Sequence, residues 1–252
     1  MDFTSKSVLV SGGSRGIGRA IAQAFAAKGA RVAIVYRSNQ AAADEALELL
    51  AGSGHIALQG DVGRAEDVEN VVAEAISQFG QIDILVNNAG IGIDHAVDQV
   101  SFEDWQSAWQ QTLQTNLIGP ANLCFCVAQH MIENGSGRIV NVSSRGAFRG
   151  EPTQPAYGAS KAGLNSLSQS LALALAPHNI FVGAVAPGFV ETEMTQDLFA
   201  GPKGDEIRGQ SPFNRVAKPE EVAHAVLFLA SAGAEFTTGT IIDVNGASYL
   251  RS

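Results

Sequence analysis

The chain has few cysteines and no pattern of metal ligands. Only 2 of its 252 residues are cysteine, so a fold held together by disulfide bonds is excluded. Cys124 and Cys126 are two residues apart in a segment of helical character, where their side chains would point in different directions. We therefore expect two buried thiols rather than a disulfide or a metal pair. The five histidines are scattered along the chain, and no metal site is predicted.

Basic residues and long apolar runs are also scarce. Lys and Arg number 16 against 25 Asp and Glu, which gives a net charge of −9. A surface of this sign repels nucleic-acid phosphates, so DNA or RNA binding is not expected. No run approaches the roughly 20 apolar residues that cross a bilayer, and residues 1–7 lack the parts of a signal peptide. We expect a cytoplasmic protein without a membrane segment.

Glycine and apolar residues, by contrast, are abundant: 27 residues are Gly, and 46% are hydrophobic. Short β-branched runs alternate with helical patterns. Most of these runs are almost continuously apolar, which is typical of parallel strands covered on both faces. The predicted strands are 7–10, 31–36, 56–59, 82–86, 138–142, 181–185 and 240–244.

Between the strands the sequence carries signals for helix ends. Helices are predicted at 18–28 and 65–79, and they end at Gly29 and Gly80. Ser101, followed by acidic residues, has the character of an N-cap. The repeated strand–helix–strand order predicts one α/β domain over residues 1–252. We expect a Rossmann-type, doubly wound parallel sheet of about seven strands, in the order 3-2-1-4-5-6-7, with helices on both faces.

Residues 191–215 form the one long irregular stretch. Glycines and prolines interrupt any helical pattern there. The segment follows a late strand, so it should lie at the carboxyl edge of the sheet, where ligands bind in such folds. We expect a lid over the substrate, with a mobile surface loop as the alternative.

A glycine-rich turn lies between the first strand and the first helix. Gly12, Gly16 and Gly18 are spaced G-x-x-x-G-x-G, unlike the commoner G-x-G-x-x-G of dinucleotide sites. Glycines at this point allow a tight turn and let backbone N–H groups approach a pyrophosphate, which a helix N-terminus stabilises. The turn predicts a dinucleotide site.

The end of the second strand indicates which dinucleotide binds. NAD sites usually have an acid there, whereas the 2′-phosphate of NADP needs a cation. Here the sequence is Tyr36-Arg37-Ser38, and Arg15 in the glycine-rich turn is a second cation. Guanidinium groups bind phosphate through paired N–H donors. We expect NADP(H) rather than NAD(H); either arginine taken separately could instead be a solvated surface residue.

Tyr157 and Lys161 are four residues apart in a predicted helix and so share one face of it. A free phenol, with a pKa of about 10, exchanges protons poorly at neutral pH. A nearby ammonium favours the phenolate, so we expect Lys161 to lower the pKa of Tyr157. Ser144 ends the fifth strand, thirteen residues before Tyr157, and its hydroxyl could bond a substrate oxygen. The spacing favours Ser144 over Ser143.

With these motifs the sequence resembles the short-chain dehydrogenase/reductase family over essentially its whole length. Asn116 and the run Asn87-Asn88-Ala89-Gly90 belong to the matching landmarks, as do Pro187-Gly188 with Thr192 and the late segment 239–246. The resemblance implies that Tyr157 is the general acid–base, that Ser144 orients the carbonyl and that Asn116 carries a proton relay through water.

The resemblance also implies a cofactor site and an assembly. Lys161 would hold the nicotinamide ribose, Asp61 and Val62 would meet the adenine, and Thr192 would lie at the carboxamide. A dimer or tetramer would form on the long helices before and after the fifth strand. With Tyr157 and Lys161, the implied cofactor-binding residues are Gly12, Ser14, Arg15, Gly16, Ile17, Gly18, Tyr36, Arg37, Ser38, Asp61, Val62, Asn88, Ala89, Gly90, Pro187, Gly188, Val190 and Thr192.

One departure from the family concerns the helix that carries Asn116. Between Trp105 and Asn116 it is about four residues longer than the commonest spacing. One added turn of regular helix would nearly preserve the direction of the side chain, so Asn116 keeps its expected role.

The substrate is the least defined feature. The chain most resembles 3-oxoacyl-carrier-protein reductases and ketone reductases. Carrier protein is acidic, yet 130–134 and 176–179, where basic residues would meet it, contain no Lys or Arg. We therefore expect a small free ketone or secondary alcohol as substrate, with acyl-carrier reduction as the alternative. A non-catalytic cofactor sensor, or an epimerase or dehydratase, is a minor alternative.

One histidine and three charged residues lie close to the motifs in the sequence. His95 follows the Asn-Asn-Ala-Gly run, and we expect it in a surface loop rather than in the pocket. Arg145, Arg149 and Glu151 surround the catalytic loop. We expect a local ion pair or a subunit contact there, with selection of a charged substrate as the alternative.

Overall fold

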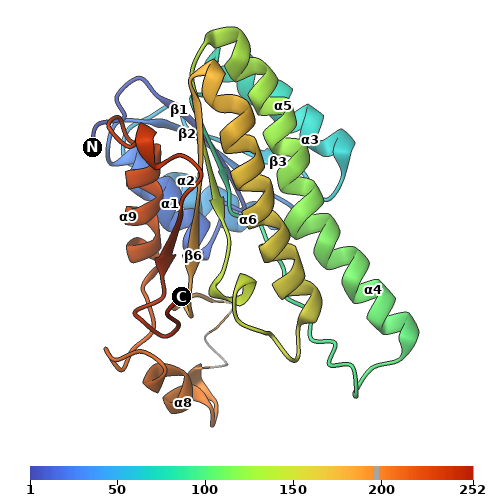
Figure 1. Ribbon diagram of the computed structural model, residues 1–252. Coiled ribbons are helices and arrows are strands. Elements are labelled where there is room, and N and C mark those ends of the chain that lie inside the picture. Colours follow the sequence, from blue (N-terminus) through green and yellow to red (C-terminus); the bar gives the residue numbers. More distant parts are fainter. Residues whose placement is uncertain (194, 196–198, 252) are drawn as a thin grey trace.

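Seven parallel strands form one sheet in the order β3-β2-β1-β4-β5-β6-β7 (Figure 1). The computed structural model describes residues 1–193, 195 and 199–251. The strand order confirms the prediction, and all seven predicted strands are present. Their bounds are β1 Ser7–Ser11, β2 Arg31–Tyr36, β3 Ile56–Gln59, β4 Ile84–Asn87, β5 Gly137–Val142, β6 Ile180–Pro187 and β7 Ile241–Val244.

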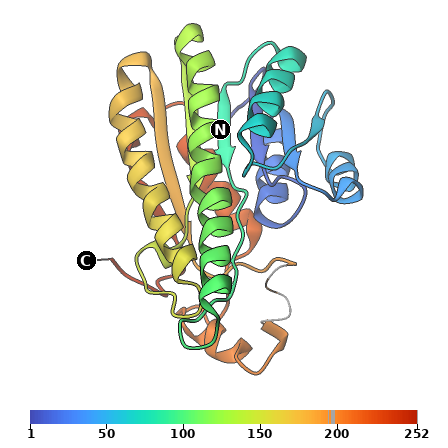
Figure 2. The same cartoon turned by 90° about the vertical axis from the view of Figure 1, so that its right-hand side faces the viewer.

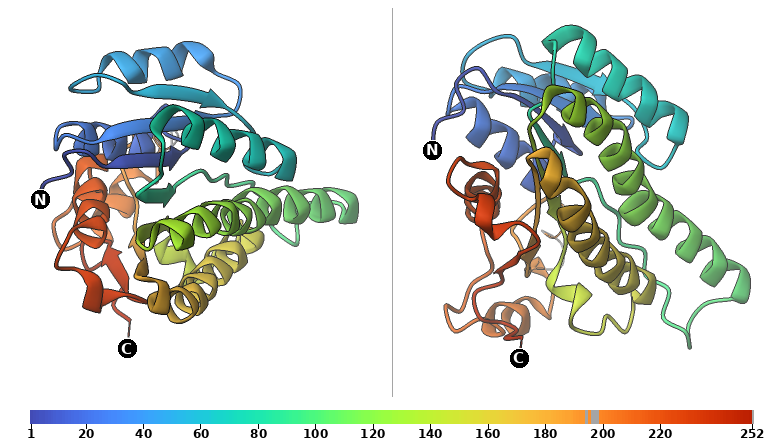
Figure 3. Two further views of the ribbon diagram at one scale, coloured as in Figure 1. Left: turned by 90° about the horizontal axis from the view of Figure 1, so that it is seen from above. Right: turned by 45° about the horizontal axis from the view of Figure 1, so that its top comes forward.

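Helices cover both faces of the sheet, as predicted (Figure 3). On one face lie α1 (Gly16–Ala26), α2 (Gln40–Glu48) and α9 (Pro219–Ala230), which enclose one hydrophobic cluster with the sheet. On the other lie α3 (Ala65–Phe79), α5 (Gly119–Asn134) and α6 (Pro155–Leu175), which enclose a second cluster. Most strand residues are apolar because helices cover both faces of the sheet.

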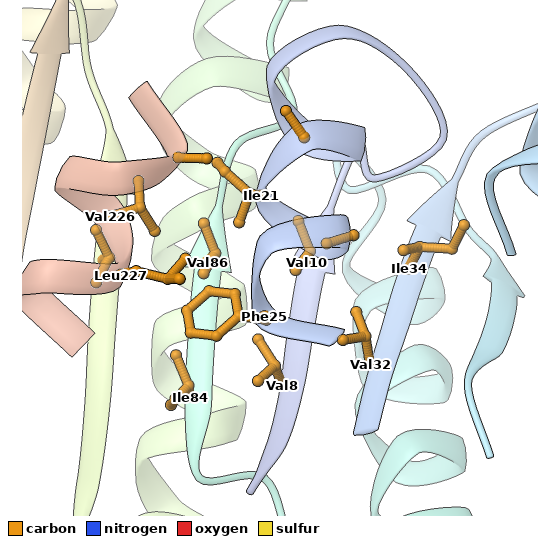
Figure 4. Packing of buried hydrophobic residues seen from close by; sticks show 14 of the residues in the cluster. Val8, Val10, Ile21, Phe25, Val32, Ile34, Ile84, Val86, Val226 and Leu227 are labelled. Carbon is orange, nitrogen blue, oxygen red and sulfur yellow. The ribbon is translucent and has the colours of Figure 1, made fainter. Parts of the chain in front are cut away.

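Phe25 occupies the centre of the first cluster. Its ring lies between the strand residues Val8 and Ile84 and the α9 residues Val226 and Leu227 (Figure 4). Burying a side chain of this size contributes about 1.5–3 kcal/mol. This packing fixes α1, and with it the glycine-rich turn that precedes α1, against the end of β1.

The helix ends follow local chemistry. Helix α3 has the predicted bounds and ends at Gly80, which has a φ of 80°. Ser101 caps α4 (Phe102–Leu113), where its Oγ accepts a hydrogen bond from the Asp104 N–H at 3.1 Å. Helix α1 begins at Gly16, two residues before the predicted start. Arg15, the N-cap residue, still has an extended backbone.

The connection from β4 to β5 consists of a loop, 88–101, and one long helical stretch. Helix α4 leads into a π-helical segment, Gln114–Ile118, and then into α5. In Figure 2, α4 and α5 run on from one another beside α6. Helix α4 is regular, but Asn116 itself lies in the π-helical segment, so the wider turn of that segment also contributes to the direction of its side chain.

The predicted lid, 191–215, is only partly described, because positions 194 and 196–198 lie outside the described residues. Its two ends are joined: Glu191 N–H donates to Ala217 O at 2.8 Å, and Ala217 N–H donates to Phe189 O at 3.0 Å. It contains the short helix α8 (Gly204–Gly209), so the expectation that no helix forms there is wrong. The glycines stand at the ends of α8, where they do not interrupt it.

The two cysteines differ in exposure. Cys124 is buried on α5, where its Sγ lies 3.2 Å from the side-chain amide nitrogen of Asn87, and burial raises the pKa of the thiol to about 12. Cys126 is only half-buried, so the expectation of two buried thiols holds for Cys124 alone. Among the described residues, no helix is long and apolar enough to span a membrane.

Candidate active site

The glycines of the glycine-rich turn are packed too tightly to accept a side chain. Gly12 has a φ of 65°, and a Cβ there would lie 3.0 Å from Ala89 Cα. A Cβ on Gly18 would lie 2.1 Å from Gly12 O. Asn88 fixes the turn from the other side, because its amide nitrogen donates to Ser11 O and Gly12 O at 3.0 and 3.1 Å. The turn and the run 88–90 are thus one structural unit.

The N-terminus of α1 opens onto this unit. Arg15, the N-cap residue, is extended and makes no side-chain capping bond, so no side-chain cap occupies the first N–H groups of α1. Thr192 approaches from the β6 side: a Cβ on Gly16 would lie 3.3 Å from Thr192 Cγ2. Pro187 ends β6, Gly188 N–H donates to Val244 O at 3.1 Å, and Val190 is buried. A cradle of backbone donors closed in this way fits a pyrophosphate.

A polar pocket of about 380 Å³ lies at the ends of β2 and β3. The side chains of Tyr36 and Val62 are buried in the hydrophobic clusters, so only their backbone could meet an adenosine there. Arg64 is a cation that the sequence reasoning missed, although it stands only three residues after Asp61. The pocket is lined by Arg37, Gln59, Gly60, Asp61, Arg64, Asp67 and Asn70.

Lys161 is buried beside Tyr157 on the first turns of α6. Its Nζ donates to Val142 O at 2.9 Å and lies 5.8 Å from the centre of the Tyr157 ring. A Cβ on Gly90 would lie 3.5 Å from Nζ, so the ammonium faces the run 88–90. Burial lowers the pKa of Lys161 to about 8.

The pKa of Tyr157 lies above its ordinary value of 10, chiefly because burial disfavours the phenolate. A hydrogen bond with Ser144 lowers the pKa, and the carboxylate of Glu151 raises it. The prediction that Lys161 lowers this pKa is therefore wrong for this form of the protein. The ammonium donates to the Val142 carbonyl, and burial is the largest influence on the pKa of the phenol.

Ser144 stands immediately after β5 in an extended conformation. Its Oγ accepts a hydrogen bond from Gly146 N–H at 2.9 Å and also meets Tyr157. Ser143 points the other way, into the protein, where its hydroxyl donates to Lys161 O at 3.3 Å. The geometry therefore places Ser144, and not Ser143, beside the phenol.

Asn116 is fully buried in the π-helical segment. Its Oδ1 accepts from Ile91 N–H at 2.8 Å, and its Nδ2 donates to Ile91 O at 2.9 Å and to Ser160 Oγ at 3.2 Å. The amide thus joins the strand-β4 loop to α6. Its place between Gly90 and α6 fits the position that the family resemblance implies.

His95 is buried, with 1% of its surface exposed, so the expectation of a surface loop is wrong. Its Nδ1 lies 2.7 Å from Ile93 O, and its Nε2 accepts from Ala156 N–H at 3.1 Å. These bonds tie the loop after β4 to the residue that precedes Tyr157. No sequence signal indicated this contact, because 61 residues separate the two partners.

Arg145, Arg149 and Glu151 form no ion pair with one another within the described part of the chain, so the expectation of a local ion pair is wrong. Arg145 and Arg149 instead each donate from Nη1 to Gln210 Oε1 at 3.0 Å. Glu151 lies over Gly146, where an added Cβ would be 2.7 Å from its Oε1.

Comparisons with known proteins agree with this geometry. A family model described as Enoyl-(Acyl carrier protein) reductase matches residues 12–247. The chain is 38% identical over 248 residues to 3-oxoacyl-[acyl-carrier-protein] reductase FabG of Staphylococcus epidermidis, which covers 98% of this chain and 100% of that protein. The chain belongs to the short-chain dehydrogenase/reductase family. This confirms the resemblance found in the sequence.

Further members of the short-chain dehydrogenase/reductase family are similarly close. FabG of Chlamydia trachomatis is 40% identical over 247 residues, 97% of each chain. The crystal structure of gox2181 matches with a TM-score of 0.91 at 35% identity and covers 98% of this chain and 96% of that one. These similarities confirm the prediction of an NADP(H)-dependent oxidoreductase that acts on C=O and CH–OH groups.

Replacing both Arg15 and Arg37 with Ala should weaken NADPH binding by at least about tenfold and leave NADH binding nearly unchanged. Each charge-assisted bond to the 2′-phosphate contributes about 1.5–3 kcal/mol, and NADH lacks that phosphate. Titrating both cofactors by nicotinamide fluorescence measures the two dissociation constants. Lys28→Ala, a change just beyond the far end of α1, is the control for loss of a positive charge outside the site. Equal losses for both cofactors would show that neither arginine reads the phosphate.

Proposed function

We propose that the protein reduces a 3-oxoacyl group, held as a thioester on an acyl carrier, to the 3-hydroxyacyl group with NADPH. The observation that carries this proposal is the activity for which the relatives are named. They are 38–40% identical over at least 97% of each chain and are named 3-oxoacyl-[acyl-carrier-protein] reductases. The sequence reasoning placed a free small ketone first and this activity second, and the relatives support the second better.

The proposed chemistry uses four side chains. When bound, NADPH supplies the hydride that adds to the carbonyl carbon. Ser144 donates a hydrogen bond to the carbonyl oxygen, and Tyr157 gives that oxygen its proton. Lys161 holds a positive charge beside the phenol as it loses the proton, and Asn116 fixes the loop at Ile91, along which the proton is replaced from solvent. Hydride and proton together convert the ketone to the alcohol.

The state of Tyr157 supports the reductive direction. Because burial holds its pKa above 10, the phenol is protonated at neutral pH and is ready to donate. Oxidation of an alcohol would need the phenolate, so its rate should rise as the pH rises towards that pKa. The same geometry argues against a non-catalytic sensor, since Ser144 bonds the phenol of Tyr157 and the Lys161 ammonium lies 5.8 Å from the centre of its ring.

The cofactor would lie along the carboxyl edge of the sheet. We propose that Gly12, Ser14, Gly16, Ile17 and Gly18 contact its pyrophosphate and that Arg15, Arg37 and Ser38 contact the 2′-phosphate. Residues 191–215 would close over the substrate, because their two ends are joined beside β6. The other residues that we propose to contact the cofactor are Asp61, Val62, Asn88, Ala89, Gly90, Lys161, Pro187, Gly188, Val190 and Thr192.

We also propose a homodimer or homotetramer built on α5 and α6. These helices lie side by side on one face of the molecule (Figure 2). Phe125 on α5 is 67% exposed and Leu173 on α6 is 82% exposed, and apolar side chains of this size favour burial in an interface. We propose a cytoplasmic location, which the two unpaired thiols support.

The carrier should raise the specificity constant. We expect kcat/KM for a 3-oxoacyl carrier protein to exceed that for the same acyl group on N-acetylcysteamine by at least about tenfold, because carrier docking adds binding energy. Steady-state oxidation of NADPH measures both. A free ketone is the second candidate, favoured by the net charge of −9 and by helix ends at 130–134 and 176–179 that lack Lys and Arg. Turnover of small ketones but not of the carrier-bound substrate would establish that second candidate instead.

A further inference from the structure

A pocket of about 140 Å³ lies beyond the carboxyl ends of β6 and β7. Arg145, Ile207 of α8 and the segment 211–217 contribute to its walls. Its walls are largely apolar, with Phe189, Ile207, Phe213 and Val244 among them. One wall is Arg145, the residue directly after Ser144. The pocket is thus linked to the candidate active site through Arg145, whereas the adenosine pocket lies at the ends of β2 and β3.

Arg145 is 5% exposed, yet it has only neutral partners. Its Nη1 donates to Gln210 Oε1 at 3.0 Å and to Ser248 Oγ at 2.7 Å, and its guanidinium lies 5.1 Å from the centre of the Phe189 ring. Within the described part of the chain, Nε and Nη2 have no hydrogen-bond acceptor and no carboxylate lies within 4 Å. A buried charge is costly unless an opposite charge accompanies it.

The other charges around the pocket are already paired. Arg215 bonds Glu221 through two contacts of 2.7 Å, and Arg251 bonds Asp243 at 2.7 Å. Glu151 acts on Arg145 only at longer range, and the exposed Arg149 offsets it. The uncompensated charge is therefore the guanidinium of Arg145, on which two adjacent N–H groups match the two oxygens of a carboxylate.

The location links this charge to the chemistry. Arg145 directly follows Ser144 in the chain, and Ser144 bonds the phenol of Tyr157. A substrate whose ketone meets Ser144 and Tyr157 would extend along the apolar walls towards Arg145. The apolar walls suit the aliphatic part of such a chain, and the guanidinium of Arg145 suits an anion at its end.

We propose that Arg145 binds a carboxylate at the far end of the substrate, so that the preferred substrates are 3-oxoacyl thioesters whose acyl chain ends in an acid. This inference rests on the proposed function for the identity of the reacting end and goes beyond it for the other end. A carboxylate suits the site because only one guanidinium is available, whereas phosphate sites commonly use more than one cation.

The test compares two thioesters that differ only at the end of the chain. The N-acetylcysteamine thioesters of 3-oxohexanoate and of 3-oxoadipate have a methyl group and a carboxylate at the sixth carbon. We expect wild type to reduce the adipate thioester with a kcat/KM at least about tenfold higher. Arg145→Met should remove this preference, and Arg145→Lys, which keeps the charge, should retain part of it. Arg149→Met, which also removes a bond to Gln210 but lies outside the pocket, should keep it.

A binding measurement separates this inference from the proposed function. Monomethyl adipate should raise the melting temperature of the NADPH complex of wild type and of Arg149→Met, but not of Arg145→Met, and dimethyl adipate should not raise it in any of them. If neither thioester is reduced, the assay with the carrier-bound substrate decides on the proposed function, and this shift alone decides on the anion site. The inference is overturned if wild type has no preference for the acid and no shift, or if Arg145→Met keeps both.

Discussion

Replacing Tyr157 with Phe should lower kcat for carbonyl reduction by about 10²–10⁴-fold, the usual contribution of a positioned general acid. The substitution removes one hydroxyl and keeps the ring, so NADPH should bind with an unchanged dissociation constant. The hydroxyl bonded to Ser144 is the proton donor in the proposed reaction, and no other phenol stands at this point of the site. Single-turnover rates and fluorescence titration measure the two quantities separately.

The control for this variant is Tyr249→Phe. Tyr249 belongs to the C-terminal tail, and its hydroxyl donates to Phe148 O at 3.2 Å, so its loss removes a phenol that is structural. It should leave kcat within about fivefold of wild type, because one neutral hydrogen bond contributes only about 1 kcal/mol. If Tyr157→Phe retains wild-type turnover, the proposed mechanism is wrong.

The sheet and the positions of the motifs could be predicted from the sequence because both depend on local patterns. A run such as 32–35 is apolar at successive positions because helices cover both of its faces, and this is visible in the sequence alone. Tyr157 and Lys161 fall on one face of α6 because the helical repeat brings residues four apart together. These features need no knowledge of distant partners.

The errors concern contacts between segments that are far apart in the sequence. His95 was expected at the surface, yet its two ring nitrogens are used by Ile93 O and by Ala156 N–H. Arg145 was expected to pair with its neighbours, but it meets Gln210 and Ser248 instead. No spacing within the sequence encodes which residue of a later segment will supply such a partner.

The prediction for the pKa of Tyr157 was wrong for a related reason. Spacing places an ammonium near the phenol, but it does not say where the N–H groups of that ammonium point. In the folded chain Nζ donates to Val142 O, a carbonyl on β5, and the surrounding burial raises the pKa of the phenol. Proximity along a helix is therefore a weaker guide to a pKa than the depth at which both groups are buried.

Replacing Lys161 with Met should have opposite effects on activity and on stability. The reaction loses the cation beside the phenol, and kcat should fall by at least about 10²-fold. The free energy of unfolding at pH 7, however, should rise by about 1–2 kcal/mol. Burial lowers the pKa of Lys161 to about 8, so the buried ammonium opposes folding by up to about 3 kcal/mol. Met removes this cost but also removes the hydrogen bond to Val142 O, which stabilises the fold by about 1 kcal/mol.

The pH dependence gives this prediction its sign. Below pH 8 the lysine is protonated in both the folded and the unfolded chain, so wild type bears the full cost of burying the ammonium. Between about pH 8 and pH 10.4 the folded chain releases the proton first, so wild type becomes more stable as the pH rises. The advantage of Lys161→Met should therefore shrink across this range. Urea unfolding at pH 7 and pH 9.5 measures it, with Lys28→Met, an exposed lysine, as the control. A variant that is less stable than wild type at pH 7, by an amount independent of pH, would show that the ammonium is not buried at a cost.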